Sequence, residues 1–215
     1  MKKTLLALLV GVSVALPAYA SPSTIVWIPS TDIQPQEQVH LNYDTYFNND
    51  GNAGYYGLTF GFENVEVGFD YVSPMDHDPM LFNAKVGLGK IGHKMPLVAG
   101  VYNVGTDSST NQEIKYLLTS YSANDGTRYS VGYGVGRKEA LGEDNKMVMA
   151  SIDKMLNDKW WAAVDYQSGD SSMGALSFGV SYNFAPNTAV IFGYDIYNNS
   201  EAYKNTATIQ LDINF

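Results

Sequence analysis

Twelve short runs of alternating apolar and polar residues follow one another from Glu37 to the last residue, and they constrain the fold more than any other feature. In the last run, "TIQLDINF" (208–215), every second residue is apolar. Because successive side chains of a strand point to opposite faces, each run predicts a β-strand with one apolar and one polar face. The runs cover residues 38–47, 55–63, 65–72, 81–90, 96–105, 114–122, 128–137, 147–155, 159–167, 175–184, 189–197 and 206–215.

The composition agrees with an all-β chain. Twenty Gly, sixteen Tyr and nine Phe are present, and aromatic residues favour strands whereas Gly disfavours helices. After residue 20, no stretch approaches the roughly 18 consecutive apolar residues of a membrane-spanning helix. We therefore assign the chain to the all-β class.

The connections between the runs alternate between long and short. The odd connections are long and polar, whereas the even ones are mostly tight turns such as Asn64, 124–126 and 157–158. This alternation is typical of an antiparallel barrel threaded through a membrane, with short turns on the periplasmic side. The long connections are residues 48–54, 73–80, 106–113, 138–146, 168–174 and 198–205.

The two faces of each run leave two arrangements open. A soluble barrel would bury the apolar faces, whereas a membrane barrel would turn them outward to lipid. Twelve strands exceed the roughly seven to nine of soluble sandwiches, and pairing of the last strand with the first would remove the sheet edges. Aromatic residues also gather at strand ends, as in an interfacial girdle. We therefore predict a closed antiparallel up-and-down transmembrane β-barrel of about twelve strands over residues 37–215. The aromatic residues are Tyr55, Tyr56, Tyr71, Trp160, Tyr166, Tyr182 and Tyr197.

Residues 1–36 precede the barrel and divide into two parts. Residues 1–20 contain Lys2 and Lys3, then an apolar run, then an Ala-Tyr-Ala site, which is the layout of a cleaved signal peptide. Residues 21–36 combine three Pro with the apolar "TIVWI" (24–28). We predict that this segment is either a plug against an apolar stripe of strands five and six, where Ala99, Val101 and Leu117 would face inward, or a periplasmic strap across the rim. The plug residues would be Ile25, Val26, Trp27 and Ile28.

The signal peptide, the twelve strands and the terminal aromatic residue resemble a small Gram-negative outer-membrane β-barrel protein of the porin-like kind. The resemblance implies a location in the cell outer membrane, in contact with its lipid and lipopolysaccharide. It also implies that the barrel assembly machinery recognises the alternating apolar residues of the last strand. These residues are Ile209, Leu211, Ile213 and Phe215.

An outward apolar face puts many charged residues in the lumen. Acidic residues outnumber basic ones there, which predicts a mildly cation-favouring passage. Alternatively, the charges pair across the lumen and stabilise or close it. The predicted lumen residues are His40, Asp44, Glu66, Asp70, Lys85, Arg128, Asp153, Asp165, Asp195 and Asp212, with Glu63, Lys115 and Lys159 placed there by the same alternation.

Other functions are weaker predictions. The chain has 22 acidic against 13 basic residues and no Cys, which argues against nucleic acid and against thiolate metal sites. Asp76, His77 and Asp78 are adjacent but read as a solvated loop, so no metal and no cofactor is predicted. His40 and His93 do not lie on the outer wall, where barrel enzymes of the resembling families keep their catalytic pair, so no enzyme is predicted.

The predicted function is passive diffusion of small hydrophilic solutes through a porin-like channel. The alternative is a barrel that does not conduct and that serves in envelope structure or in surface interaction through its acidic loops. Fold alone does not decide between them.

Overall fold

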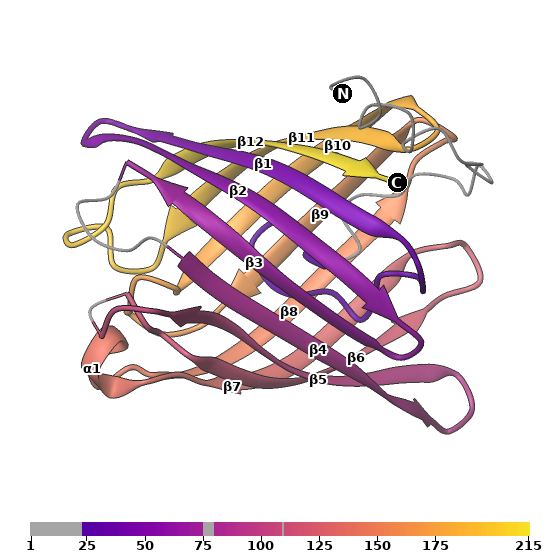
Figure 1. Cartoon of the computed structure of the whole chain (residues 1–215), viewed down its shortest axis with the longest axis horizontal. Helices are drawn as coiled ribbons and strands as arrows, with labels where there is room; N and C mark the ends of the chain where they lie inside the picture. The colour runs from indigo at the N-terminus through magenta and orange to yellow at the C-terminus, as the bar shows by residue number, and fades with distance from the viewer. Residues whose placement is uncertain (1–22, 75–79, 109) are drawn as a thin grey trace, which may run out of the picture.

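A computed structural model describes residues 23–74, 80–108 and 110–215, which form a closed barrel of twelve antiparallel strands (Figure 1). Each strand pairs with the strands before and after it, and β12 closes the barrel against β1. The predicted closed antiparallel barrel is confirmed. The strands are β1 (Val39–Asn48), β2 (Gly51–Phe62), β3 (Val65–Ser73), β4 (Met80–Ile91), β5 (Met95–Gly105), β6 (Ile114–Ser122), β7 (Arg128–Val135), β8 (Lys146–Met155), β9 (Trp160–Gln167), β10 (Ala175–Ala185), β11 (Thr188–Tyr197) and β12 (Thr206–Asn214).

A short helix, α1 (Lys138–Leu141), lies in the connection between β7 and β8. Within the described ranges, no helix is long and apolar enough to cross a membrane. The predicted signal peptide and the loop residues Asp76, His77 and Asp78 lie outside the described residues.

Apolar side chains face outward from the barrel and polar side chains face inward. In β7, Tyr129 and Val131 are 48% and 54% exposed, whereas Ser130 between them is 6% exposed. In β10, Phe178 is exposed and Ser177 is fully buried. A soluble barrel would bury its large apolar side chains instead. The inverted arrangement expected of a membrane barrel is therefore the observed one.

The strand register brings inward polar side chains of successive strands together. Ser177 lies directly opposite Asp165 on β9 and Asp195 on β11, and Asp195 lies opposite Thr206 on β12. All four residues are buried. A polar row therefore runs around this part of the inner wall.

The two ends of the barrel differ. Val39 and Phe215 exchange two backbone hydrogen bonds, of 3.1 and 2.9 Å, at the end that also carries the even-numbered, short connections (Figure 1). We call this the turn end, and the opposite end, which carries α1, the loop end.

One predicted long loop is a tight turn. The sequence predicts a loop over 48–54, but β1 and β2 continue to a turn at residues 49–50. Asn48 pairs with Gly51 and Thr45 pairs with Gly54 across it. Gly51 has a φ of 146°, a conformation that glycine adopts far more readily than other residues. Pairing with β1 overrides the low intrinsic strand preference of this Gly- and Asn-rich stretch.

Candidate functional site

The first described residues form a hairpin inside the barrel (Figure 1). This N-terminal hairpin comprises residues 23–38. Ser30 N donates to Ser23 O at 3.1 Å, and Ile25 N donates to Ile28 O at 2.8 Å, so the chain reverses between Ile25 and Ile28. The hairpin leads directly into β1 and therefore enters the lumen from the turn end.

A buried carboxylate holds the tip of the N-terminal hairpin. Asp165 Oδ2 accepts hydrogen bonds from the backbone N–H groups of Val26, Trp27 and Ile28 at 2.8, 2.9 and 3.4 Å. Gln210 Nε2, from β12, donates to Val26 O at 3.0 Å. Charge-assisted hydrogen bonds of this kind are the strong ones in proteins, so the tip is fixed in the lumen by backbone contacts.

A buried ion pair holds the base of the same hairpin. Lys85 Nζ lies 3.1 Å from Glu66 Oε1 and also donates to the carbonyl oxygens of Ser23 and Ser30 at 3.4 and 3.3 Å. Glu66 Oε2 accepts a hydrogen bond from Gln34 N at 2.8 Å. Lys85 and Glu66 therefore both form hydrogen bonds with the hairpin backbone in addition to their ion pair.

A second ionic contact lies nearer the turn end. Arg128 bridges Asp32 of the hairpin, at 2.5 Å, and Asp153 of β8, at 2.9 Å. The hydroxyl oxygens of Thr31 and Ser120 are 2.7 Å apart, which joins the hairpin to β6. The hairpin is thus attached to the wall along its whole length.

One part of the inner wall is apolar and packs against the hairpin. Ile25 and Ile28 are fully buried in this cluster. On β5 and β6, the apolar stripe that packs against the hairpin contains Val98, Tyr116 and Leu118 and differs from the predicted one. Of the predicted residues, Leu117 points outward and is 48% exposed, Ala99 lies directly opposite Leu117 and shares its face, and Val101 lines the cavity. The two strands are apolar on both faces, so alternation alone does not identify the inner one. The barrel residues of the cluster are Val98, Ile114, Tyr116, Leu118, Leu141, Met147, Met149, Trp161, Ala163, Met173 and Ile191.

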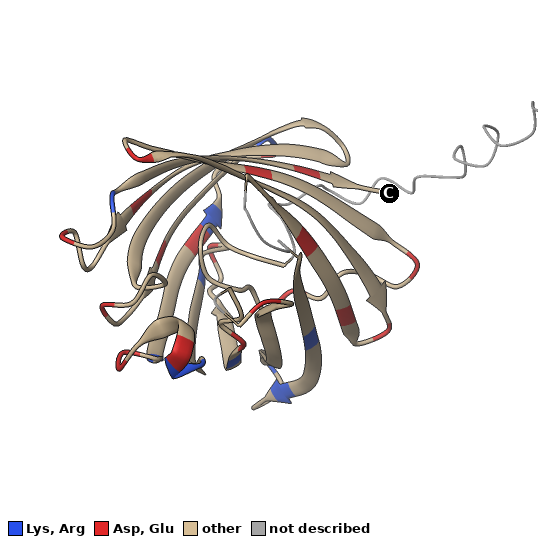
Figure 2. Cartoon of the chain, turned by 60° about the vertical axis from the view of Figure 1, so that its left-hand side comes forward, with Lys and Arg blue, Asp and Glu red and all other residues tan. Residues whose placement is uncertain are grey.

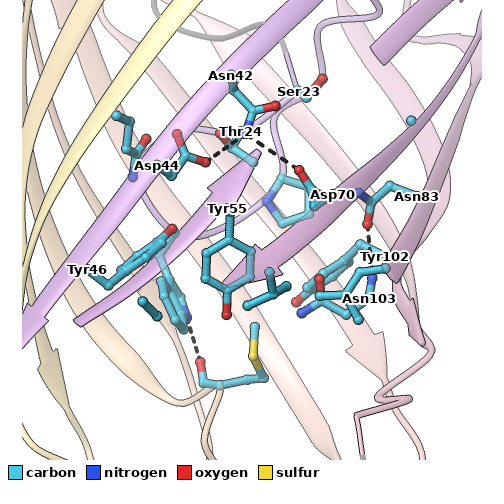
Figure 3. Close-up of a pocket in the computed structure, with 18 of the residues that line it drawn as sticks. Ser23, Thr24, Asn42, Asp44, Tyr46, Tyr55, Asp70, Asn83, Tyr102 and Asn103 are labelled. Atoms are coloured by element: carbon cyan, nitrogen blue, oxygen red, sulfur yellow. Dashed lines mark hydrogen bonds between the residues drawn. The ribbon is translucent and has the colours of Figure 1, made fainter. Parts of the chain in front are cut away.

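A cavity of about 690 Å³ occupies the remaining part of the lumen (Figure 3). Its walls come from β1 to β6, β11, β12, the N-terminal hairpin and residues of the loop end. It extends from Asn48 and Asp50, beside the loop end, to His40 and Lys85 at the level of the hairpin base. Trp27 at the hairpin tip forms part of the wall.

Amides and carboxylates line one side of the cavity. Asn42 Nδ2 donates to Asp44 Oδ2 at 2.9 Å and to Asp70 Oδ1 at 3.5 Å, and Asn83 Nδ2 donates to Asp70 Oδ2 at 2.6 Å (Figure 3). Among the described residues, no Lys or Arg lies within ion-pair distance of Asp44 or Asp70. These two carboxylates are therefore held by amides rather than by cations.

A third carboxylate of the cavity has a histidine partner. His40 Nε2 lies 3.1 Å from Asp212 Oδ1, and His40 Nδ1 lies 3.1 Å from Asn214 Oδ1. Acidic segments occur on strands as well as on loops (Figure 2). The cavity wall is correspondingly acidic.

Aromatic rings form the wall of the cavity nearer the loop end. The ring of Trp27 meets those of Tyr46 and Tyr197 edge to face, with centroids 6.1 and 5.8 Å apart, and Tyr46 meets Tyr55 at 5.3 Å. Trp27 Nε1 donates to Met173 O at 2.9 Å. The hairpin tip is therefore also tied to the loop between β9 and β10.

Comparison with known proteins identifies the fold. No protein-family model matches the sequence, and no curated protein sequence matches it. Among solved structures, the KdgM porin matches with 12% identity and a TM-score of 0.57, covering 82% of this chain and 98% of its own. The NanC porin matches with 11% identity and a TM-score of 0.55, covering 82% and 98%. The fold is that of the KdgM and NanC outer-membrane porins.

A third match is a KdgM porin in complex with disordered oligogalacturonate, with 11% identity and a TM-score of 0.55, covering 83% of this chain and 98% of its own. The porin-like fold is an outer-membrane barrel fold, and barrels of this kind are typically not enzymes. Within the described residues, no group of three or more His, Asp or Glu side chains is arranged to hold a metal ion.

The predicted lumen residues of this porin-like barrel all lie on the inner wall. Asp44 and Asp70 line the cavity, and Arg128 joins Asp32 to Asp153. The remaining seven, Asp153 included, are each at most 6% exposed: His40, Glu66, Lys85, Asp153, Asp165, Asp195 and Asp212.

Three further charged residues expected in the lumen are not there. Glu63 is exposed in the turn after β2, with a φ of 47°. Lys115 is exposed and pairs with Glu113 at 2.8 Å, and Lys159 precedes β9 and is exposed. Glu63 and Lys159 lie beyond strand ends, where alternation no longer fixes a face. Lys115 lies within the regular ladder of β6, and it points outward because its neighbours Ile114 and Tyr116 take the inner face. The lumen is consequently more acidic than the sequence predicts.

The apolar residues of the predicted assembly signal alternate along β12. Ile209 and Phe215 are 40% and 61% exposed, and Leu211 and Ile213 are partly exposed between them. The polar residues between them, Thr208, Gln210 and Asp212, are buried in the lumen.

Several lining residues were not predicted. Asn42, Tyr46 and Asn83 share the inner face of their strands with predicted charged residues, so the same alternation would have identified them. Gln210 has the same signal, on the polar face of β12. The sequence carries no signal for their joint arrangement around a cavity.

Proposed function

We propose that this protein is an outer-membrane channel for passive diffusion of small hydrophilic solutes. The observation that supports this most is the polar cavity of about 690 Å³ inside a barrel of the KdgM and NanC fold. Pockets that hold small molecules commonly measure about 300–1,000 Å³. The outward apolar faces would contact outer-membrane lipid, with lipopolysaccharide around the loop end and the turn end in the periplasm.

We also propose that residues 21–36 act as a plug. The base of the N-terminal hairpin packs closely against the inner wall near the turn end. At Gly61 there is no room for a Cβ atom, which would collide with the carbonyl oxygens of Gln34 and Pro35. In this state the cavity communicates with the loop end, and passage through the turn end requires movement of the hairpin.

A mild preference for cations belongs to the same proposal. Asp44 and Asp70 face the cavity without a cationic partner among the described residues, whereas Lys85 and Arg128 are engaged by carboxylates and by the hairpin. Carboxylates surrounded by a low-dielectric wall concentrate cations. Oligogalacturonate, present in the KdgM complex, is a chain of sugar carboxylates, and this wall would repel such an anion.

Liposome swelling tests the channel. Purified protein in liposomes should admit small neutral sugars faster than large ones, and its bilayer current should reverse at a potential that indicates cation preference. Absence of swelling for every sugar, with protein shown to be folded, would contradict the channel, and anion preference would contradict the selectivity.

The occupied lumen favours a second function, a structural or surface-interaction barrel that does not conduct. A variant that lacks residues 23–36 distinguishes the two. Swelling that rises in this variant supports a plugged channel, whereas no swelling in either protein supports the structural role.

A further inference from the structure

We propose that the cavity binds a small organic cation, an alkyl ammonium ion, between the carboxylates of Asp44, Asp70 and Asp212. The inference rests on the proposed function, because it names the class of solute that the channel would carry. It does not need conduction to be measured.

The three carboxylates come from three strands and share one wall of the cavity. Asp212 lies opposite Asn42 in the pairing of β12 with β1, two residues from Asp44. Asp44 and Asp70 accept hydrogen bonds from the same amide nitrogen, Asn42 Nδ2, at 2.9 and 3.5 Å. Three like charges this close favour a cation among them, because each otherwise raises the energy of the others.

A glycine allows the carboxylate of Asp70 to approach β1 closely. Gly57 on β2 lies between Asn42 on β1 and Asp70 on β3. A Cβ atom at this position would collide with the side-chain oxygens of both residues. The β2 backbone therefore leaves room for the Asp70 carboxylate to reach the Asn42 amide and the Asp44 side of the wall.

The wall contains hydrogen-bond capacity that the protein does not use. Asp212 is 2% exposed and lines the cavity, and its Oδ2 atom has no hydrogen-bond partner among the described residues. Its other oxygen faces His40. Asp44 receives a hydrogen bond from Asn42. A buried carboxylate oxygen without a donor is costly, and an ammonium group, with up to three N–H donors, would supply what is missing.

Aromatic rings extend the same surface toward the loop end. Tyr46 follows Asp44 on the inner face of β1, and Tyr55 lies beside it (Figure 3). The faces of aromatic rings attract cations, and groups of such rings recognise alkylated ammonium ions. An organic cation can therefore place its charge on the carboxylates and its carbon chain on the rings.

A bare metal ion fits this site less well. Within the described residues, no group of three or more His, Asp or Glu side chains is arranged to hold a metal ion, and the cavity is much larger than an ion. A neutral sugar could use the amides of Asn42, Asn83 and Asn103, but it would leave the carboxylate charges uncompensated. The carboxylates therefore favour the ammonium ion over the sugar.

Titration calorimetry on the full mature chain in detergent tests the proposal with the diamine putrescine as probe. The uncharged analogue 1,4-butanediol and the dianion succinate serve as ligand controls. We expect putrescine to bind at least about tenfold more tightly than butanediol, which corresponds to about 1.4 kcal/mol, and succinate not to bind. The wild-type comparison needs no variant and therefore does not depend on how a variant folds.

Two substitutions, each of which removes one negative charge, test where putrescine binds. D44N should weaken putrescine binding about tenfold or more, as expected for the loss of one charge-assisted contact. E143Q removes one charge from the exposed loop near α1, where Glu143 pairs with Lys138 at 2.7 Å, and should leave binding unchanged.

Equal affinities for putrescine and butanediol would overturn the proposal in favour of a neutral polyol. Absence of putrescine binding, or tight binding that D44N does not weaken, would also overturn it. Putrescine binding in a barrel that fails the swelling assay would uphold the site and reject the channel. Swelling without putrescine binding would reject the site alone.

Discussion

Single side chains of the inner wall determine how the N-terminal hairpin is held. Asp165 stands out because one of its oxygens accepts three backbone hydrogen bonds from the hairpin tip. It is also buried opposite Ser177, which lies between it and Asp195. A carboxylate in such surroundings is stabilised by the N–H groups of the hairpin, so wall and hairpin depend on one another.

The substitution D165A should loosen the tip. Three backbone N–H groups would lose their acceptor, and since a buried donor left unsatisfied costs about 1–3 kcal/mol, we expect docking to weaken by roughly 3 kcal/mol. Limited proteolysis of the folded barrel in detergent measures this as faster cleavage within residues 23–38. The matched control S177A removes a buried hydroxyl on the neighbouring strand that has no hydrogen-bond partner among the described residues, and this variant should be cleaved at the wild-type rate. Equal rates for all three proteins would show that Asp165 does not hold the hairpin.

The turn between β6 and β7 gives a prediction about pH. Asp125 accepts a hydrogen bond from Lys154 Nζ at 2.9 Å and from the backbone and hydroxyl of Thr127 at 3.0 and 2.9 Å. The hydrogen bond from Lys154, followed by those from Thr127, lowers the pKa of Asp125 well below its usual range. A lowered folded-state pKa means stabilisation that is present above the unfolded pKa, about 3.9, and lost as the pH falls below it.

The variant D125N should therefore melt below the wild type at pH 7, and the two melting temperatures should converge as the pH falls below about 4. Because Asp125 is exposed, the difference should be small and should shrink at high salt. Thermal unfolding followed by circular dichroism measures it. A difference between the two proteins that stays constant from pH 7 to pH 2 would contradict the assigned cause.

Among the structural elements, the N-terminal hairpin and the inner face of β6 contact each other at a point where a reducible disulfide can be introduced. The hydroxyl oxygens of Thr31 and Ser120 are 2.7 Å apart, and the chain has no Cys of its own. In the double variant T31C/S120C, a disulfide would fix the hairpin to the wall. We expect slower liposome swelling for the oxidised than for the reduced protein, by several-fold. The single variants T31C and S120C cannot form the link and should not respond to reductant. Equal swelling of oxidised and reduced double variant would contradict a moving plug.

The strands themselves were largely predictable, and the reason is the side-chain period of two. Strand β6 begins at Ile114 and ends at Ser122, as its sequence predicts, because each face alternates and polar residues bound it. The β1–β2 turn was not predictable, since residues 51–54 join β2 through pairing with β1. The inward face of β5 and β6 was ambiguous because both faces are apolar.

The candidate site was predictable only in part. Alternation identifies Asp44, Asp70 and Asp212 as lumen residues, but it does not show that they share one wall. That arrangement depends on the barrel register and on the absence of a side chain at Gly57. Likewise, "TIVWI" predicts a buried segment, but nothing local links Val26 to Asp165, 139 residues away.

At the scale of the whole molecule, the lumen has two parts with different tasks. The apolar wall formed mainly by β5 to β9 packs against the hairpin, and the acidic wall of β1 to β4 and β12 lines the cavity. Both depend on the same inversion, in which lipid takes the place of a protein core for the outer apolar faces. Trp160 and Trp161 at the start of β9 report on this inversion, because they are neighbours in sequence and are 41% and 3% exposed.

Quenching of tryptophan fluorescence by brominated lipids therefore tests the inverted barrel directly. Two single-tryptophan variants are needed, one that keeps Trp160 and one that keeps Trp161, with the other tryptophans, including Trp27, replaced by Phe. In bilayers of brominated lipid we predict strong quenching of Trp160, which faces outward, and little quenching of Trp161, which faces the lumen. Strong quenching of Trp161 with Trp160 unaffected would contradict the arrangement of apolar residues outside and polar residues inside.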